Sequence, residues 1–214
     1  MLDKKGSFYA AFNFYTEPLF IIRCCCHRFT SMRLYLFSFL LFFSSQTIAQ
    51  DIDRIYVVNE GRLDFKSEAP LEIIQASSKA TKGLINFTKE TFAFSVAINS
   101  FQGFNSALQR EHFNENYMES DKFQKATFAG RLIDKIDPDR DGTFSIRAKG
   151  KLNIHGVEQE RIIQATLTIK GSSIEINSVF SVPLEEHNIA IPKVVQQKIA
   201  ETIHVELNAK AVKR

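Results

Sequence analysis

The sequence predicts an all-β fold of antiparallel strands, with short helices between some of them. Three observations lead to this prediction: apolar and polar residues alternate over several segments, turn-forming residues separate these segments, and two segments show helical spacing instead. Alternation with a period of two is typical of strands that bury one face. Antiparallel sheets commonly keep the other face in water, so we expect the strands to be antiparallel.

Alternation is clearest in residues 91–99, 161–170 and 202–211. In each segment every second residue is apolar. The residues that the pattern assigns to buried faces are Phe92, Phe94, Val96, Ile98, Ile163, Ala165, Leu167, Ile169, Ile203, Val205, Leu207, Ala209 and Ala211. A one-residue error in phase would assign every residue of a strand to the opposite face. The residues assigned to one strand are therefore all correct or all wrong together.

Turn signals separate the strands. The run DPDRDG at residues 137–142 predicts a hairpin loop, and His155-Gly156 and the KGSS run at residues 170–173 predict two further reversals. Seven or eight strands result, which can close as a sandwich or as an up-and-down barrel. An eight-stranded barrel can hold one small ligand, but periodicity does not distinguish a hollow barrel from a filled one.

Two segments depart from the strand pattern. Residues 105–117 place Leu108, Phe113 and Tyr117 at helical spacing, and a later segment begins with Pro192, which suits a first helical position. Short helices are predicted at both places.

The N-terminal region has the features of a secretory signal. Residues 32–49 combine a basic start, an apolar run of about ten residues and a small-residue exit. A bilayer-spanning helix needs roughly 20 apolar residues, which favours a cleaved signal over a membrane anchor. We therefore expect a mature domain of residues 50–214 in the periplasm or outside the cell, and residues 1–31 are expected to be an extension from an early start codon.

Charge and cysteine content exclude several classes of function. All three cysteines lie at residues 24–26, so the expected mature chain has none for a disulfide or a thiolate metal site. Five of the 27 Lys and Arg residues and two of the 24 Asp and Glu residues precede position 50, which leaves 22 of each sign. This balance gives no support to a nucleic-acid partner or to an anionic-membrane partner.

The polar run REHFNENYMESDKF at residues 110–123 could be a metal site, a catalytic site or a lid. His112 and Glu115 have a helical spacing that could present two metal ligands, but zinc sites usually have three or four protein ligands. Ser120 lacks the sequence context of a nucleophile. We favour a lid whose apolar side covers a barrel mouth, with Glu111, Glu115 and Glu119 on one solvated face; contacts to a ligand headgroup are the alternative.

The residues HFNENYMESDKFQKATF (112–128) and GKLNIHGVEQE (150–160) resemble the motifs of the YceI-like family of exported bacterial proteins. The resemblance covers essentially the whole expected mature chain. By position, Arg110, Glu111, His112, Phe113 and Ser120 match the first motif, and Leu152, His155, Gly156 and Val157 match the second.

Other positions depart from the family pattern. The early His-Ser motif is replaced at residues 59–62, Phe-Phe-Asp is replaced by Tyr117-Met118-Glu119, and a proline is replaced by Lys125. These departures indicate a divergent branch.

The resemblance implies a lipocalin-like, extended eight-stranded antiparallel barrel with short helices over one end. It also implies a non-enzymatic carrier of a polyprenyl chain or an isoprenoid quinone, without a catalytic residue, a metal or a cofactor. A homodimer is compatible with the same sequence. The residues expected to bind the ligand are Phe65, Phe92, Phe94, Val96, Ile98, His112, Phe113, Phe128, Ile146, Leu152, Ile154, Leu167 and Leu207.

Two alternatives remain open at this point. A barrel filled by its own side chains would act as a structural or stress-related interaction module, against which the small inward residues Ala165, Ala209 and Ala211 argue mildly. An enzyme would need polar groups converging inside the barrel. His155, at a strand-to-strand turn, is expected to hydrogen-bond to backbone, with a headgroup contact as the other option.

Overall fold

The computed structural model describes residues 53–214; the expected signal peptide (32–49) and extension (1–31) lie outside the described residues. Strands account for most of this part of the chain. They are β1 (Ile55–Glu68), β2 (Ile73–Ser78), β3 (Lys82–Asn86), β4 (Thr91–Ala97), β5 (Lys125–Leu132), β6 (Gly142–Ile154), β7 (Val157–Lys170), β8 (Ser173–Pro183) and β9 (Thr202–Lys213). The helical segments are the α-helix α2 (Ala107–His112), the π-helix η2 (Phe113–Tyr117) and the 3-10 helices η1 (Ile98–Ser100), η3 (Glu185–His187) and η4 (Lys193–Val195).

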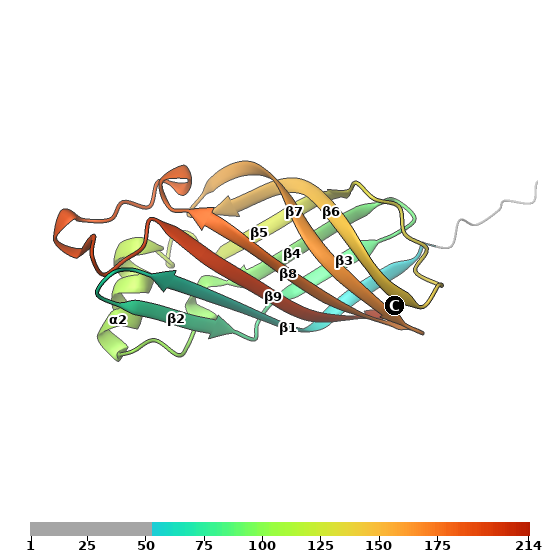
Figure 1. Cartoon of the computed structure of the whole chain (residues 1–214), viewed down its shortest axis with the longest axis horizontal. Helices are drawn as coiled ribbons and strands as arrows, with labels where there is room; N and C mark the ends of the chain where they lie inside the picture. Colours follow the sequence, from blue (N-terminus) through green and yellow to red (C-terminus); the bar gives the residue numbers. More distant parts are fainter. Residues whose placement is uncertain (1–52) are drawn as a thin grey trace, which may run out of the picture. The chain divides into compact units, whose positions relative to one another are not determined.

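The nine strands close into an antiparallel barrel (Figure 1). From β3 to β9 each strand pairs with the next, and β9 pairs with β1 along most of its length. On its other edge, β1 pairs with β3 through Ile55–Val58 and with β2 through Leu63–Glu68. β2 and β3 therefore lie one after the other along the same edge of β1 and together count as one strand of the barrel. The expected eight-stranded barrel is confirmed.

The hairpin reversals are where the sequence predicts them. His155 and Gly156 join β6 to β7 with positive φ angles of 53° and 74°. Gly171 (φ 58°) begins the two-residue reversal from β7 to β8. Along β6, buried and exposed residues alternate, as the period-two pattern requires.

The segment of residues 105–117 is helical, as predicted, but it changes pitch within its length. In α2, the N–H of Gln109 donates to the capping Ser106 Oγ (3.1 Å). In η2, the N–H of Met118 donates to the Phe113 carbonyl (2.9 Å), five residues back. The helix then ends, and Glu119 takes a left-handed conformation (φ 41°). The predicted glutamate face is therefore wrong at Glu119, which lies beyond the helix.

Two further element boundaries differ from the predictions. The helix expected from Pro192 is only the single 3-10 turn η4, for which Pro192 is the N-terminal cap. Ile98 was expected in a strand, but β4 ends at Ala97 and Ile98 begins η1. Its side chain is nevertheless buried.

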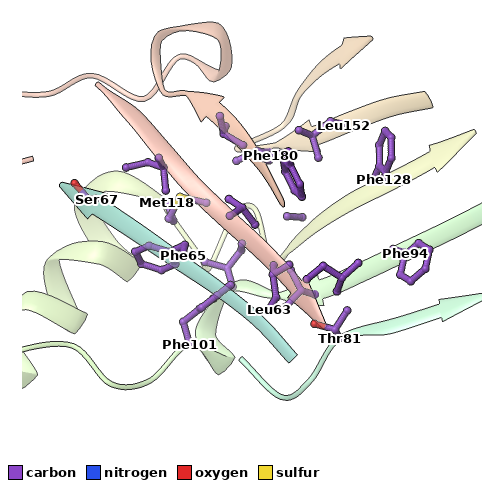
Figure 2. Close-up of a pocket in the computed structure, with 18 of the residues that line it drawn as sticks. Leu63, Phe65, Ser67, Thr81, Phe94, Phe101, Met118, Phe128, Leu152 and Phe180 are labelled. Atoms are coloured by element: carbon purple, nitrogen blue, oxygen red, sulfur yellow. The ribbon is translucent and has the colours of Figure 1, made fainter. Parts of the chain in front are cut away.

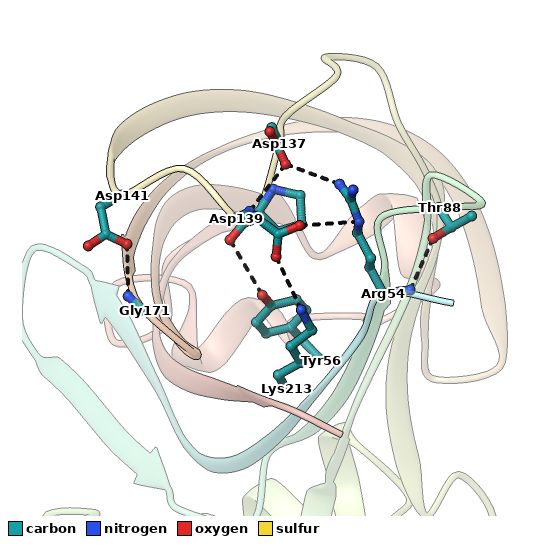
Figure 3. A network of polar contacts seen from close by, with 9 residues as sticks. Arg54, Tyr56, Thr88, Asp137, Asp139, Asp141, Gly171 and Lys213 are labelled. Carbon is teal, nitrogen blue, oxygen red and sulfur yellow. Dashed lines mark hydrogen bonds and ion pairs between the residues drawn. The ribbon is translucent and has the colours of Figure 1, made fainter. Parts of the chain in front are cut away.

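One end of the barrel is closed by the loop between β5 and β6 (Figure 3). Pro138 of this loop is fully buried, and the Tyr56 hydroxyl donates a long hydrogen bond to its carbonyl (3.4 Å). Ion pairs surround the buried proline: Arg54–Asp137 (3.0 Å), Arg54–Asp139 (3.4 Å) and Lys213–Asp139 (3.1 Å). The loop therefore acts as a plug that the sequence indicated only as a turn.

Candidate functional site: an apolar cavity in one half of the barrel

An apolar cavity of about 570 Å³ occupies the half of the barrel that lies toward α2. Its floor is formed by buried side chains that also belong to the main hydrophobic core, including Phe92, Leu132, Ile146 and Leu167. The rings of Phe92 and Phe128 lie 4.9 Å apart (centroids) at this level. Figure 2 shows apolar side chains from strands on several sides of the barrel around the cavity.

Every residue that the sequence predicted for ligand binding lines this cavity. These residues are Phe65, Phe92, Phe94, Val96, Ile98, His112, Phe113, Phe128, Ile146, Leu152, Ile154, Leu167 and Leu207. The alternation on each strand thus has the phase expected for a barrel interior. That these residues contact a ligand stays a prediction.

The other half of the barrel is filled. Its side chains belong to the same core cluster but do not line the cavity: Tyr56, Val58, Phe87, Ile169, Ile174, Ala209 and Ala211. Ala165 lines the cavity as expected, whereas Ala209 and Ala211 do not; Ala211 lies opposite Val58 and Ile174 of the neighbouring strands. The alternative of a filled barrel applies to the plugged end alone.

Aromatic rings of residues 101–123, which we call the lid segment, form the upper wall of the cavity. The Phe113 ring stacks on Phe65 (centroids 5.3 Å apart, interplanar angle 19°) and contacts Phe104 (5.0 Å) and Phe101 (5.9 Å). Sequence reasoning missed Phe101 and Phe104, which line the cavity from the connection between β4 and α2. Their three-residue spacing in FQGF is a weak helical signal, and no strand pattern reaches them.

β2 does not form a ladder with β4, so at this end the lid segment completes the wall. The backbones of Ser77 and Gln102 exchange two hydrogen bonds (2.8 and 2.9 Å) and attach the connection to the outer edge of β2. The Asn105 amide donates to the Ile73 carbonyl (3.0 Å). The helix is thus held against the strand edge by polar contacts and against the interior by its rings.

The titratable side chains that line the cavity come from the segments around its mouth: Glu72, His112, Tyr117 and Lys198. The Gln109 amide donates to the Glu72 carboxylate (2.9 Å). Burial raises the pKa of Tyr117, which keeps its phenol protonated at neutral pH. Deeper in the barrel, the Thr81 hydroxyl is buried without a hydrogen-bond partner among residues 53–214.

His155 lies outside the cavity lining. Its Nδ1 is 3.2 Å from the His187 carbonyl, as expected for a ring bonded to backbone, and its Nε2 is 3.1 Å from the Glu119 carboxylate. The Phe123 ring packs edge-on against it (4.6 Å). His155 therefore joins the end of the lid segment to η3.

Within residues 53–214, no three His, Cys, Asp or Glu side chains are arranged to hold a metal ion. No helix in this part of the chain is long and apolar enough to cross a membrane.

Comparison with known proteins places this barrel in a family. The model of the YceI-like domain matches residues 58–211. Two similar solved structures are a polyisoprenoid binding domain from Saccharophagus degradans implicated in plant cell wall breakdown and BcnA of Burkholderia cenocepacia. The first has 13% identity and a TM-score of 0.64, with 74% of this chain and 98% of that chain covered. The second has 12% identity and a TM-score of 0.60, with 71% and 96% covered.

No curated protein sequence is significantly similar to this chain. At these identities the two structures show a common fold, whereas the family match rests on the sequence pattern over most of the described residues. The chain therefore belongs to the YceI-like family.

Proposed function

We propose that this protein is a non-enzymatic carrier that holds an isoprenoid-type lipid, a polyprenyl chain or an isoprenoid quinone, outside the cytoplasm. The observation that carries the proposal is the apolar cavity of about 570 Å³, open at the lid end and closed by packed side chains at the other. Its volume is in the range of roughly 300–1,000 Å³ that is typical of small-molecule sites.

Burial of the ligand's hydrocarbon supplies the affinity. Each buried CH₂ group contributes about 0.8 kcal/mol, and an isoprene unit has about five carbons. A few buried units would therefore offset the cost of association and give binding at about micromolar concentration or tighter.

A carrier fits the cavity better than an enzyme does. The walls are formed mostly by aliphatic and aromatic side chains, and the titratable groups come from the segments at the mouth. Such a lining offers contact area to a long apolar chain, while the polar groups of the mouth suit the ligand's polar end. The similar fold of a polyisoprenoid binding domain from Saccharophagus degradans supports the same ligand class.

Export is the second part of the proposal, and it is supported by the signal-like pattern of residues 32–49. The mass of the protein recovered from a bacterial periplasm would test it. Cleavage after Ala49 supports export, and an intact leader on protein retained in the cytoplasm contradicts it.

The carrier proposal is tested by native mass spectrometry of the full chain, expressed in a bacterium and purified without detergent in the form that intact mass identifies. We expect a co-purifying lipid or quinone near one per protein, released by organic extraction. A bare protein that also fails to take up added polyprenols and quinones would contradict the carrier proposal.

A matched pair of variants locates the binding. Ala165→Phe adds a ring at a cavity-lining position and is expected to lower the bound fraction severalfold, whereas Ala129→Phe adds the same ring at an exposed position of β5 and should leave it unchanged. Thermal unfolding shows whether each variant is folded. Equal loss in both variants, or in neither, would argue against binding in the cavity.

A further inference from the structure

Four large aliphatic side chains are exposed around the mouth of the cavity. They are Leu71 (67% exposed), Ile73 (54%), Leu108 (58%) and Val194 (90%), and we call them the apolar rim. They come from the β1–β2 connection, β2, α2 and η4, which lie at the same end of the barrel in Figure 1. Exposed aliphatic side chains that gather at one place usually mark an interaction site.

The rim is held together by hydrogen bonds between its segments. The N–H of Leu71 donates to the Gln197 carbonyl (2.9 Å), which connects the β1–β2 turn to the segment after η4. The Asn105 amide donates to the Ile73 carbonyl (3.0 Å), and the N–H of Ala200 donates to Ser67 Oγ (2.9 Å). Hydrogen bonds therefore connect the segments that carry the exposed side chains.

The rim is continuous with the cavity interior. Leu108 both lines the cavity and is more than half exposed, and Val195, which also lines the cavity, follows Val194 in the chain. Ile73, by contrast, is on the outer face of β2, because its neighbour Ile74 lines the cavity. An apolar surface thus runs from the floor of the cavity to the outside. A lipid chain that enters here would leave one apolar surface and meet another without crossing water.

The lysines at one side of the rim favour an anionic partner, although Glu72 lies between the rim residues Leu71 and Ile73. Lys193 and Lys198 flank the most exposed rim residue, Val194, and are exposed. No ion pair within residues 53–214 includes either lysine. Although residues 50–214 are neutral as a whole, this segment is locally basic, and basic segments are attracted to anionic lipid surfaces.

We propose that the apolar rim docks on the surface of an anionic lipid bilayer, so that the cavity mouth opens into the hydrocarbon layer. Aliphatic side chains of the rim enter the acyl region while Lys193 and Lys198 lie at the headgroups, which is the arrangement of interfacial amphipathic segments. Docking would let the cavity take up and release its ligand at the bilayer. This purpose rests on the proposed carrier function.

The chain contains no tryptophan, so a single introduced tryptophan reports on its own surroundings. Val194→Trp places the reporter on the rim, and Val179→Trp places it on the outer wall of β8, where Val179 is 69% exposed. Each full-length variant is mixed with vesicles of phosphatidylglycerol and phosphatidylcholine, some of which contain brominated acyl chains.

We expect the emission of Val194→Trp to move to shorter wavelength and to be quenched by the brominated lipid, while Val179→Trp changes in neither respect. Vesicles of phosphatidylcholine alone, or high salt, should weaken the effect. Because both variants carry the same N-terminal segment, a contribution of that segment to membrane attachment does not produce the difference between them.

A second pair of readouts separates docking from ligand binding. In the double variant Leu71→Ser and Val194→Ser, we expect loss of vesicle binding and unchanged uptake of a polyprenol from solution, because neither residue lines the cavity. Absence of the Val194→Trp response in a protein that still takes up polyprenol would overturn the docking proposal alone. A response that depends on protein concentration without vesicles would also overturn it, in favour of a second copy of the chain on the rim.

Discussion

At the residue scale, the histidines near the second family motif are structural. His187 is fully buried, its Nδ1–H donates to the Val157 carbonyl (3.2 Å), and its Nε2 has no hydrogen-bond partner among the described residues. Its own carbonyl faces the His155 ring. The two histidines thus connect η3 to the β6–β7 turn and to Glu119, outside the cavity.

Burial predicts how His187 affects stability with pH. Desolvation lowers the pKa of His187 below its ordinary value of 6.5; the hydrogen bond to the Val157 carbonyl opposes this shift, and the nearby Arg161 adds to it. The unfolded chain therefore binds more protons at this site than the folded chain below about pH 6.5, so the free energy of unfolding falls as the pH decreases through and below that value.

We expect His187→Asn to reduce this loss of stability between about pH 6.5 and pH 5, because it removes the group that must stay neutral when buried. Urea unfolding at a series of pH values measures the effect. The exposed His204→Asn serves as the control and should keep the wild-type slope. An identical slope in His187→Asn and wild type would show that His187 does not set this dependence.

At the element scale, Phe113 is central to the packing of the lid segment. Phe113 is the cap of α2 and the first residue of η2, and its ring contacts Phe65, Phe101 and Phe104. The π-turn brings Phe113 and Met118 into one hydrogen-bonded turn, and both line the cavity. Single-turn π-helices are often found at functional sites.

Removing this ring should loosen the lid and speed the release of ligand. We expect Phe113→Ala to increase the release rate of a bound polyprenol severalfold and to lower stability by less than the ~3–5 kcal/mol of a fully buried ring, because Phe113 is half-buried. Transfer of labelled polyprenol to acceptor vesicles measures the rate, and urea unfolding measures the stability.

Phe123→Ala is the matched control, since this half-buried ring packs on His155 and does not line the cavity. It should lower stability without changing release. If both variants release ligand equally fast, general destabilisation rather than the lid would explain the result.

At the scale of the whole molecule, the barrel is hollow between the lid segment and the floor of the cavity, and it is filled beyond that floor. The plug around Pro138 and the core around Tyr56 and Ile174 close the far end, so a ligand chain cannot pass through. A group about the size of water occupies roughly 30 Å³, so 570 Å³ accommodates about 19 such groups, or roughly four isoprene units.

This geometry predicts an upper limit on useful chain length. For linear prenols, we expect affinity to rise with each unit up to about four units and then to level off, because additional units remain outside the cavity. Competition against one labelled prenol measures the series, and Ala165→Phe should move the plateau to shorter chains. A steady rise up to about eight units would mean that the filled half opens to admit the ligand.

The sequence by itself determined the antiparallel strands, the hairpin turns at His155-Gly156 and Gly171, and the inward phase of residues such as Phe92, Leu152 and Leu207. These features are local, because an alternation with a period of two and a turn-forming residue each depend on only a few consecutive positions. The lid segment was also recognisable, although its π-turn and the short η4 were not, because hydrogen bonding within one or two turns depends on what the segment packs against.

Only the tertiary structure decided how far the cavity extends. Ala165 and Ala211 have the same pattern in sequence, yet one lines the cavity and the other is enclosed by the core near Tyr56 and Ile174. The difference arises because each level of the barrel is filled by side chains from strands far apart in sequence, and the loop carrying Pro138 folds back onto one end. The sum of those volumes, which no single strand specifies, leaves one half of the barrel hollow.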